Sequence, residues 1–249
     1  MKPYSVISSS SHEPGSINEW AATHQLHWGN QKIAGWDESK FIQSQQFMTS
    51  HFWSDRHSVN VFSVIGTAHP DYIGLTWSEF LSQGKRMSIN QHLLCKNPAY
   101  YLDTDVKNPS ILYVSLDGKH WYVNGDGNHR TCLARFQFAR LNADQTLSQT
   151  MLHGVHVDDY RINHRLQELY GHIDAVLKSG KVRHGGGIEA VRETVARDDG
   201  PAWKLDYYLP RIRHTTVGGN VEMLDQDGAR ALLGDLVRRS RSLLSRMIP

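Results

Sequence analysis

The middle of the chain carries a hydrophobic pattern that predicts a β-hairpin followed by a sharp break. Two apolar runs, 111–116 and 119–123, flank the pair Asp117-Gly118, which is typical of a two-residue type I′ turn. The second run leads into the segment 124–128, whose two glycines favour backbone torsions that strands rarely adopt. The pattern therefore predicts that the chain leaves the sheet at this segment.

Helical spacing begins directly after this break. Apolar residues recur one, four and seven positions after the first of them, as one face of a helix requires; they are Cys132, Leu133, Phe136 and Ala139. Arg130, Arg135 and Arg140 point in other directions of the same helix. Two cysteines in the whole chain cannot build a disulfide scaffold, and Cys132 is expected in the core.

Elsewhere the pattern predicts a mixture of strands and helices. The predicted strands are 59–65, 151–157 and 204–212. The predicted helices are 76–84, 89–94, one that starts at Asp158-Asp159 and ends at Gly180, 188–197 and 227–247. Residues 18–53 are polar with many aromatic rings and predict short helices and loops. Because strands and helices do not alternate regularly, we expect the α+β class rather than a doubly wound parallel sheet.

Length and composition fit an ordinary globular protein. The chain has 249 residues, of which 39% are hydrophobic and 21% charged, and this excludes collagen-like, coiled-coil and charge-driven disordered classes. Apolar runs such as 59–65 are far shorter than the roughly 20 residues that a bilayer helix needs, so no membrane partner is expected. The N-terminal residues contain no apolar segment of a secretory signal, and we expect a cytoplasmic protein.

Positive charge is concentrated in the downstream part of the chain. Residues 1–84 carry 4 basic and 7 acidic side chains, whereas residues 85–249 carry 23 basic and 18 acidic ones. This excess is compatible with an anionic ligand but weaker than the basic stripe of a dedicated DNA-coating protein. The arginines of the last helix fit an exposed charged face, contacts to a DNA backbone or an oligomer contact. The candidate DNA-binding residues are Arg135, Arg238, Arg239 and Arg241.

The candidate site is the turn between the hairpin and the helix, Gly125-Asp126-Gly127-Asn128-His129-Arg130. Its glycines let backbone amides converge, and the helix N-terminus adds unpaired N–H donors and a positive dipole end, so the turn favours phosphate. His129 supplies an acid or base, Arg130 a charge clamp and Asp126 a ligand for a divalent cation. An alternative interpretation is a tight turn in which Asn128 caps the helix and Arg130 is a solvated charge.

A known family shares this arrangement. The central box of the ParB/sulfiredoxin superfamily resembles the stretch NPSILYVSLDGKHWYVNGDGNHRTCLARFQ, and the resemblance extends over residues 85–141. It implies a small mixed sheet with surrounding helices, and a phosphate- or nucleotide-binding site at Gly125, Gly127, Asn128 and Arg130. The expected organisation is a disordered Ser-rich arm (1–18), a ParB/sulfiredoxin-like core with an N-terminal extension (19–150) and an α/β C-terminal extension packed on the core (151–249).

Two differences from the family's pattern limit which of its activities we expect in this chain. Sulfiredoxins carry a catalytic Cys immediately before His-Arg, where this chain has Asn128, so their thiol chemistry should be absent. The region after residue 150 shows no helix-turn-helix, which argues against centromere binding of the ParB type. The chain is then most similar to plasmid fertility-inhibition proteins of the oncogenic suppression type, and this resemblance implies ATP hydrolysis and DNA cleavage.

The resulting hypothesis is a phosphohydrolase, both DNase and nucleoside triphosphatase, that acts in fertility inhibition during plasmid conjugation. Asp126, with Mg²⁺, and His129 would activate water, and Arg130 would steady the phosphate of ATP or DNA. Arg130→Ala should then reduce hydrolysis and leave the fold intact. The alternative is a non-catalytic nucleotide- or DNA-binding module that regulates a plasmid protein or a conjugation-system protein. Product formation separates the two.

Overall fold

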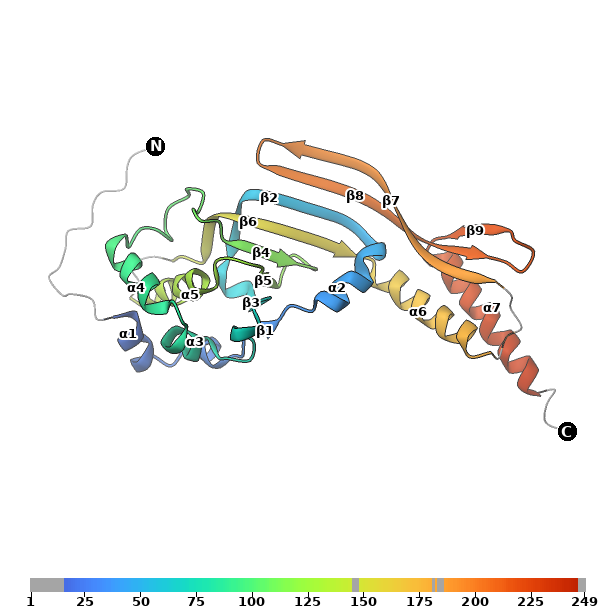
Figure 1. Cartoon of the computed structure of the whole chain (residues 1–249), viewed down its shortest axis with the longest axis horizontal. Helices are drawn as coiled ribbons and strands as arrows, with labels where there is room; N and C mark the ends of the chain where they lie inside the picture. Colours follow the sequence, from blue (N-terminus) through green and yellow to red (C-terminus); the bar gives the residue numbers. More distant parts are fainter. Residues whose placement is uncertain (1–15, 145–147, 181, 183–185, 246–249) are drawn as a thin grey trace.

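A nine-stranded mixed sheet runs through the chain (Figure 1). The computed structural model describes residues 16–144, 148–180, 182 and 186–245. Neighbouring strands follow the order β1-β3-β5-β4-β6-β2-β8-β7, and β9 pairs with β8. The strands are β1 (Ala34–Gly35), β2 (Met48–Asn60), β3 (Val64–Thr67), β4 (Leu112–Ser115), β5 (Trp121–Val123), β6 (Met151–Ile162), β7 (Gly187–Gly200), β8 (Trp203–Thr215) and β9 (Val221–Leu224). Parallel and antiparallel pairs both occur, and the predicted α+β class is confirmed.

The helices gather at the two ends of this sheet (Figure 1). They are α1 (Ile17–Thr23), α2 (Glu38–Ser44), α3 (Trp77–Gln83), α4 (Met87–Lys96), α5 (Asn128–Ala143), α6 (His164–Lys178) and α7 (Gln226–Ser245). Residues 1–15 of the expected disordered arm lie outside the described residues. The end of that arm is helical instead, because Ser16 and Glu19 form a capping box at the start of α1.

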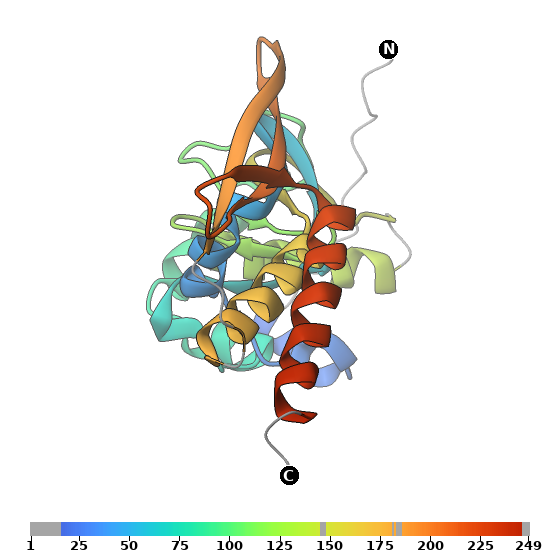
Figure 2. The same cartoon turned by 90° about the vertical axis from the view of Figure 1, so that its right-hand side faces the viewer.

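Two hydrophobic cores lie along the sheet. The first packs α5 and α3 on the strands around β5, with Tyr113 and Phe136 fully buried. The second lies between α6, α7 and β8 and includes Ile173 and Ile212 (Figure 2). The buried hydrophobic residues of β6, Leu152, Val155 and Val157, belong to the first core. The expected boundary at residue 150 therefore separates β6 from the first core, in which β6 packs.

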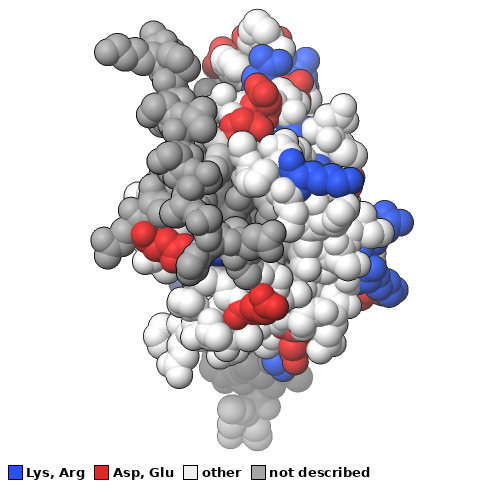
Figure 3. Space-filling view, turned by 90° about the vertical axis from the view of Figure 1, so that its left-hand side faces the viewer, with Lys and Arg blue, Asp and Glu red and all other residues white. Residues whose placement is uncertain are grey.

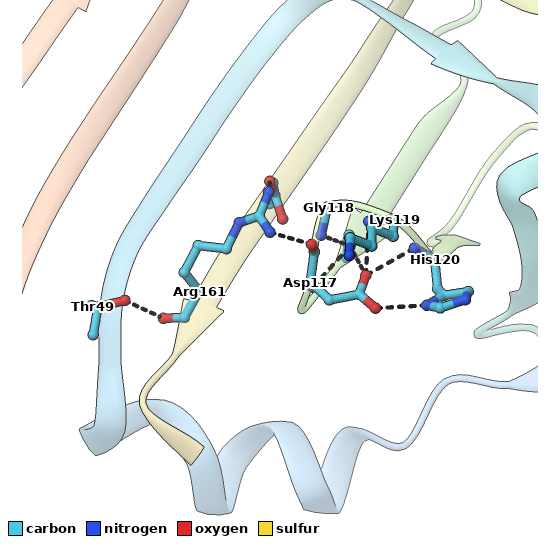
Figure 4. A network of polar contacts seen from close by, with 8 residues as sticks. Thr49, Asp117, Gly118, Lys119, His120 and Arg161 are labelled. Atoms are coloured by element: carbon cyan, nitrogen blue, oxygen red, sulfur yellow. Dashed lines mark hydrogen bonds and ion pairs between the residues drawn. The ribbon is translucent and has the colours of Figure 1, made fainter. Parts of the chain in front are cut away.

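The predicted hairpin exists, but its turn is longer than two residues. Pairing between β4 and β5 ends at Tyr113 with Val123 and Val114 with Tyr122. The Asp117 carboxylate accepts hydrogen bonds from the amides of Lys119 and His120, each at 2.8 Å (Figure 4). Because this side chain satisfies two loop amides, a wider loop replaces the predicted type I′ turn. Asp117 thus acts as a turn residue.

Several predicted elements in the second half are wrong in type or length. Residues 188–197 form most of strand β7 rather than a helix, since β7 pairs with β8 along its whole length. The chain remains a strand through Asp158-Asp159, and α6 starts only at His164, after Asn163 caps it. In both places strand pairing with a long neighbour outweighs a sequence pattern that also fits a helix.

The first half also contains a long strand that the sequence pattern did not predict. β2 occupies residues 48–60, of which 48–53 lie in the region expected as short helices and loops, and it pairs with both β6 and β8. The predicted strand 59–65 is divided by a short 3-10 helix, 61–63, between β2 and β3. The predicted helices 76–84, 89–94 and 227–247 are confirmed as α3, α4 and α7, with α4 longer than expected and residues 246–247 outside the described residues.

Candidate functional site

The Gly-rich turn between β5 and α5 has the predicted backbone. Gly125 and Gly127 adopt φ values of 98° and 111°, in the region that favours glycine. A Cβ atom on Gly127 would approach the side chain of Ile111 to 2.6 Å, so the position has no room for one. Helix α5 begins at Asn128 with Gly127 in the N-cap position, and the interpretation in which Asn128 caps the helix is therefore wrong. The first amides of α5 directly follow the turn.

A cavity of about 480 Å³ opens beside this turn, between it, helix α4 and the segments 97–101 and 108–109. Small-molecule sites have volumes of roughly 300–1,000 Å³, so the size suits a nucleotide. The predicted residues that line the cavity are Asp126, Gly127, His129 and Arg130; Gly125 and Asn128 do not line it. Further lining residues are the cations Arg86 and Lys96 and the apolar or aromatic Leu93, Leu94, Tyr100 and Pro109.

Arg130 holds the wall of this cavity together. Its guanidinium donates hydrogen bonds to the carbonyl oxygens of Pro109 and Ser110, the latter at 2.8 Å, and to the Tyr100 hydroxyl at 3.1 Å. A further contact of 3.3 Å joins it to the Asp126 carboxylate. Only 11% of the side chain is exposed. The interpretation of Arg130 as a solvated charge is therefore wrong, because most of its donors are used by the protein itself.

His129 lies in the cavity as a neutral ring. It packs against Tyr72 and Phe80, and its Nε2 atom accepts a hydrogen bond of 3.3 Å from the amide of Arg86. Partial burial, followed by the positive charges of Arg86 and His69, lowers the pKa of His129. With Nε2 as the acceptor, the ring proton sits on Nδ1. In this tautomer Nδ1 is a hydrogen-bond donor, and Nε2, the acceptor atom of the ring, already accepts the bond from Arg86.

Asp126 is the acidic side chain among the lining residues. One carboxylate oxygen accepts a hydrogen bond of 2.7 Å from the amide of Gly127, and the other contacts Arg130. The side chain is 62% exposed. In the described part of the chain, no group of three or more His, Cys, Asp or Glu side chains is placed to hold a metal ion. Mg²⁺ at Asp126 would therefore need phosphate oxygens as further ligands.

Asn128 is a structural residue of the turn. Its side-chain oxygen accepts a hydrogen bond of 2.6 Å from Thr67, and its amide nitrogen donates one of 3.2 Å to the carbonyl of Gly125. The residue is buried. These bonds fix the turn against β3, so the Asn128 side chain serves the fold of the turn. Its backbone amide remains part of the first turn of α5.

Cations and helix geometry give the cavity its polarity. Arg86 and Lys96 stand at the two ends of α4, are exposed and make no side-chain ion pair within the described chain. Figure 3 shows the end of the molecule that carries α4, where the Lys and Arg side chains in view are scattered among acidic and uncharged residues. Among the residues that line the cavity, the Lys and Arg side chains are Arg86, Lys96 and Arg130. Sequence reasoning missed Arg86 and Lys96, although they bracket a predicted helix.

The candidate DNA-binding arginines do not form one surface. Arg135 is buried, which corrects its assignment as a DNA contact: it lies over the rings of Trp77 and Trp28, at 4.1 and 4.8 Å, and donates to the carbonyl of Val64. Arg238 and Arg239 are exposed on α7, and both pair with Asp235. The Arg241 side chain lies outside the described residues. Ion pairing within the helix favours the solvated charged face for α7.

Comparisons of the chain with protein-family models, with curated proteins and with solved structures found no match. None of the helices in the described chain is long and apolar enough to cross a membrane.

Proposed function

We propose that this protein binds a nucleoside triphosphate in the cavity beside α5. The observation that carries the proposal is the mixed lining of one cavity. The N-terminus of α5 and the cations Arg86 and Lys96 line it together with the apolar or aromatic side chains Leu93, Tyr100 and Pro109. A ligand that has both an anionic part and a flat apolar part fits such a lining.

The phosphates would lie at the α5 end. The amides of Asn128, His129 and Arg130 have no acceptor within the first turn of the helix and point along its axis toward the turn. The Nδ1–H of His129 adds a neutral donor, and the flexible Arg86 and Lys96 side chains can follow the phosphate chain. Arg130 supports this arrangement indirectly, because it fixes the segment that carries Pro109.

The nucleoside would lie against the apolar part of the lining. Tyr100 offers a ring held by its bond to Arg130, and Leu93 on α4, which also lines the cavity, is 55% exposed. An aromatic base covering these groups would remove apolar surface from water. Inorganic phosphate alone would leave that wall uncovered, which favours a nucleotide.

Hydrolysis is the second candidate function, and it is favoured by the exposed Asp126 carboxylate next to the phosphate end. Asp126 could share Mg²⁺ with the ligand's phosphates and orient water. Binding is better supported than turnover, because Arg130 is occupied by the protein and Nε2 of His129 already accepts a bond. DNA cleavage would require that the same cavity accepts a DNA strand. The resemblance to fertility-inhibition proteins supports a cytoplasmic setting in which nucleotide binding controls a plasmid or conjugation-system partner.

Calorimetric titration of the full chain with ATP, adenosine and inorganic triphosphate, each with and without Mg²⁺, tests the proposal. ATP should bind more tightly than either fragment, and Lys96→Ala should weaken ATP and triphosphate but not adenosine. Lys119→Ala, an exposed lysine on the β4–β5 loop, is the matched control and should bind like the wild type. Equal binding by wild type and Lys96→Ala would contradict the site. Phosphate release, lost in Asp126→Asn, would establish hydrolysis as well.

A further inference from the structure

A second cavity, of about 390 Å³, opens beside the β4–β5 loop. Its walls come from that loop, from the segment 35–37 with the start of α2, and from the first residue of α6. It shares no lining residue with the cavity beside α5, and its volume lies within the range of roughly 300–1,000 Å³ that small-molecule sites have. We call it the loop cavity; its lining includes Trp36, Lys40, Asp117, His120, Tyr122 and His164.

One imidazole of the loop cavity is held by an ionised carboxylate. Nδ1 of His120 lies 2.6 Å from the Asp117 carboxylate (Figure 4). The same carboxylate accepts hydrogen bonds from the backbone amides of Lys119 and His120. Partial burial acts to raise the pKa of Asp117, but the hydrogen bonds from His120 and Lys119 outweigh it and hold the pKa well below its usual range. Because an ionised carboxylate can only accept, the Nδ1 atom of His120 carries a proton.

The other ring nitrogen of His120 is available to a ligand. With the proton of the neutral ring on Nδ1, the Nε2 atom has a free lone pair. The edge of the ring that carries Nε2 points away from Asp117 in Figure 4, and the side chain is 58% exposed. The bond to Asp117 is the only hydrogen bond of this imidazole within the described residues. An imidazole held in this way is suited to remove a proton from a bound hydroxyl group.

A cation and a second imidazole line the same cavity. Lys40 on α2 and His164 at the start of α6 are exposed, and neither forms an ion pair within the part of the chain that the structure describes. Asp37 also lines the cavity, but one of its carboxylate oxygens accepts the amide of Lys40 at 2.8 Å, at the N-cap of α2. The loop cavity thus combines a proton acceptor, a group that can donate a proton and a cation that can contact an anion.

Two aromatic rings form a further part of the lining. Trp36 and Tyr122 lie with their ring centroids 5.4 Å apart and their planes at 67°. Both are half-buried, and the indole of Trp36 is fixed by a hydrogen bond of 2.8 Å from its Nε1 atom to Glu38. Aromatic side chains with an accessible ring are the usual platforms for the bases of single-stranded nucleic acid. The two rings therefore favour a substrate that carries a flat base.

We propose that the loop cavity binds single-stranded RNA and cleaves it by attack of a ribose 2′-hydroxyl on the adjacent phosphate. RNA carries the three parts that this lining matches: a base for the aromatic rings, a phosphate for Lys40, and a hydroxyl next to that phosphate for His120. DNA lacks this hydroxyl. The activity does not depend on nucleotide binding beside α5, because the two cavities share no lining residue.

The reaction consists of two proton transfers and one exchange of P–O bonds. Nε2 of His120 takes the proton of the 2′-hydroxyl, and the 2′ oxygen forms a bond to phosphorus. The bond from phosphorus to the 5′ oxygen of the next nucleotide breaks, and protonated His164 gives its proton to that oxygen. Lys40 stabilises the charge that develops on the phosphate oxygens. The products are a 2′,3′-cyclic phosphate and a free 5′-hydroxyl, and water returns both histidines to their starting protonation states.

Incubation of the full chain with an end-labelled single-stranded RNA, with and without EDTA, tests the proposal. The RNA should be cut at the same rate in both cases, to fragments that mass spectrometry identifies as 2′,3′-cyclic phosphates, whereas DNA and 2′-O-methyl RNA of the same sequence should stay intact. His120→Ala should cleave about 100-fold more slowly or worse, since general acid–base catalysis contributes about 10²–10⁴-fold. His172→Ala is the matched control, because it removes an exposed histidine of α6 outside the loop cavity; it should cleave like the wild type.

Two further measurements separate catalysis from a loss of structure. Added imidazole should restore part of the activity of His120→Ala, because the small molecule can occupy the vacated position and accept the proton, whereas a damaged fold would not recover. Asp117→Asn should lower kcat with little change in KM, because Asp117 positions the imidazole and does not contact the RNA. Circular dichroism of each variant verifies that the fold is retained.

Three results would overturn the proposal. A wild type that leaves RNA intact would show that the loop cavity does not catalyse this reaction. Cleavage that His120→Ala retains in full would come from another site. Equal cleavage of RNA and 2′-O-methyl RNA would exclude attack by the 2′-hydroxyl.

Discussion

The Arg130→Ala variant tests whether the guanidinium holds the cavity wall in place or contacts the bound ligand. The substitution removes hydrogen bonds to the carbonyl oxygens of Pro109 and Ser110 and to the Tyr100 hydroxyl. A hydrogen bond to a charged group contributes about 1.5–3 kcal/mol, and carbonyls freed at the cavity edge recover part of this from water. The contact to the exposed Asp126 adds about 0–1 kcal/mol. The free energy of unfolding should therefore fall by about 3 kcal/mol, which corresponds to about 6–12 °C in Tm.

Urea and thermal unfolding of the ligand-free protein, followed by circular dichroism, measure this loss. Arg86→Ala is the matched control, because Arg86 lines the same cavity but its exposed side chain makes no ion pair within the described chain. Its free energy of unfolding should change by less than about 0.5 kcal/mol, while its affinity for ATP falls. The reasoning would be refuted by an Arg130→Ala protein as stable as the wild type, or by equal loss of stability in both variants.

Three further predictions concern single side chains. Arg135→Ala should lower the free energy of unfolding by about 3–5 kcal/mol, because it empties a buried site between two tryptophans; DNA affinity measured by fluorescence anisotropy should not change. Gly127→Ala should cost about 2 kcal/mol or more in urea unfolding, since it strains a positive φ and meets a neighbouring side chain. His129 should titrate by NMR below the ordinary value of about 6.5. As the pH falls below that value, His129 is protonated in the unfolded chain before it is protonated in the folded protein. The contribution of neutral His129 to stability is therefore complete above that value and is lost as the pH falls through the folded pKa. His129→Gln should remove this contribution.

Local patterns in the sequence were sufficient to predict the elements on which the cavity lies. The apolar spacing after the Gly-rich turn predicted α5, and the two glycines predicted the positive φ angles that the turn has. Local patterns were not sufficient to predict the strands of the second half of the chain. β7 has a residue spacing that also fits a helix, and only its pairing with β8 decides its structure. Pairing partners distant in the chain are not visible in local periodicity.

The position of the candidate site was predictable, but the roles of its side chains were not. Asp126, His129 and Arg130 do meet at one cavity, as expected. Arg130 and Asn128, however, bond to segments that come near only in the folded chain, at residues 100–110 and 67. A polar side chain in a phosphate-binding motif is as suitable for holding the loop as for holding the ligand. Only the three-dimensional contacts distinguish the two.

The most direct test of the central claim is a map of where ATP binds. Backbone amide chemical shifts of the isotopically labelled protein, recorded as ATP is added, report each position separately. We expect the largest changes at Gly127–Arg130 and along α4, with those at α4 reduced when inorganic triphosphate replaces ATP. Changes confined to α7 or to the β4–β5 loop, or the absence of any change, would contradict ATP binding in this cavity.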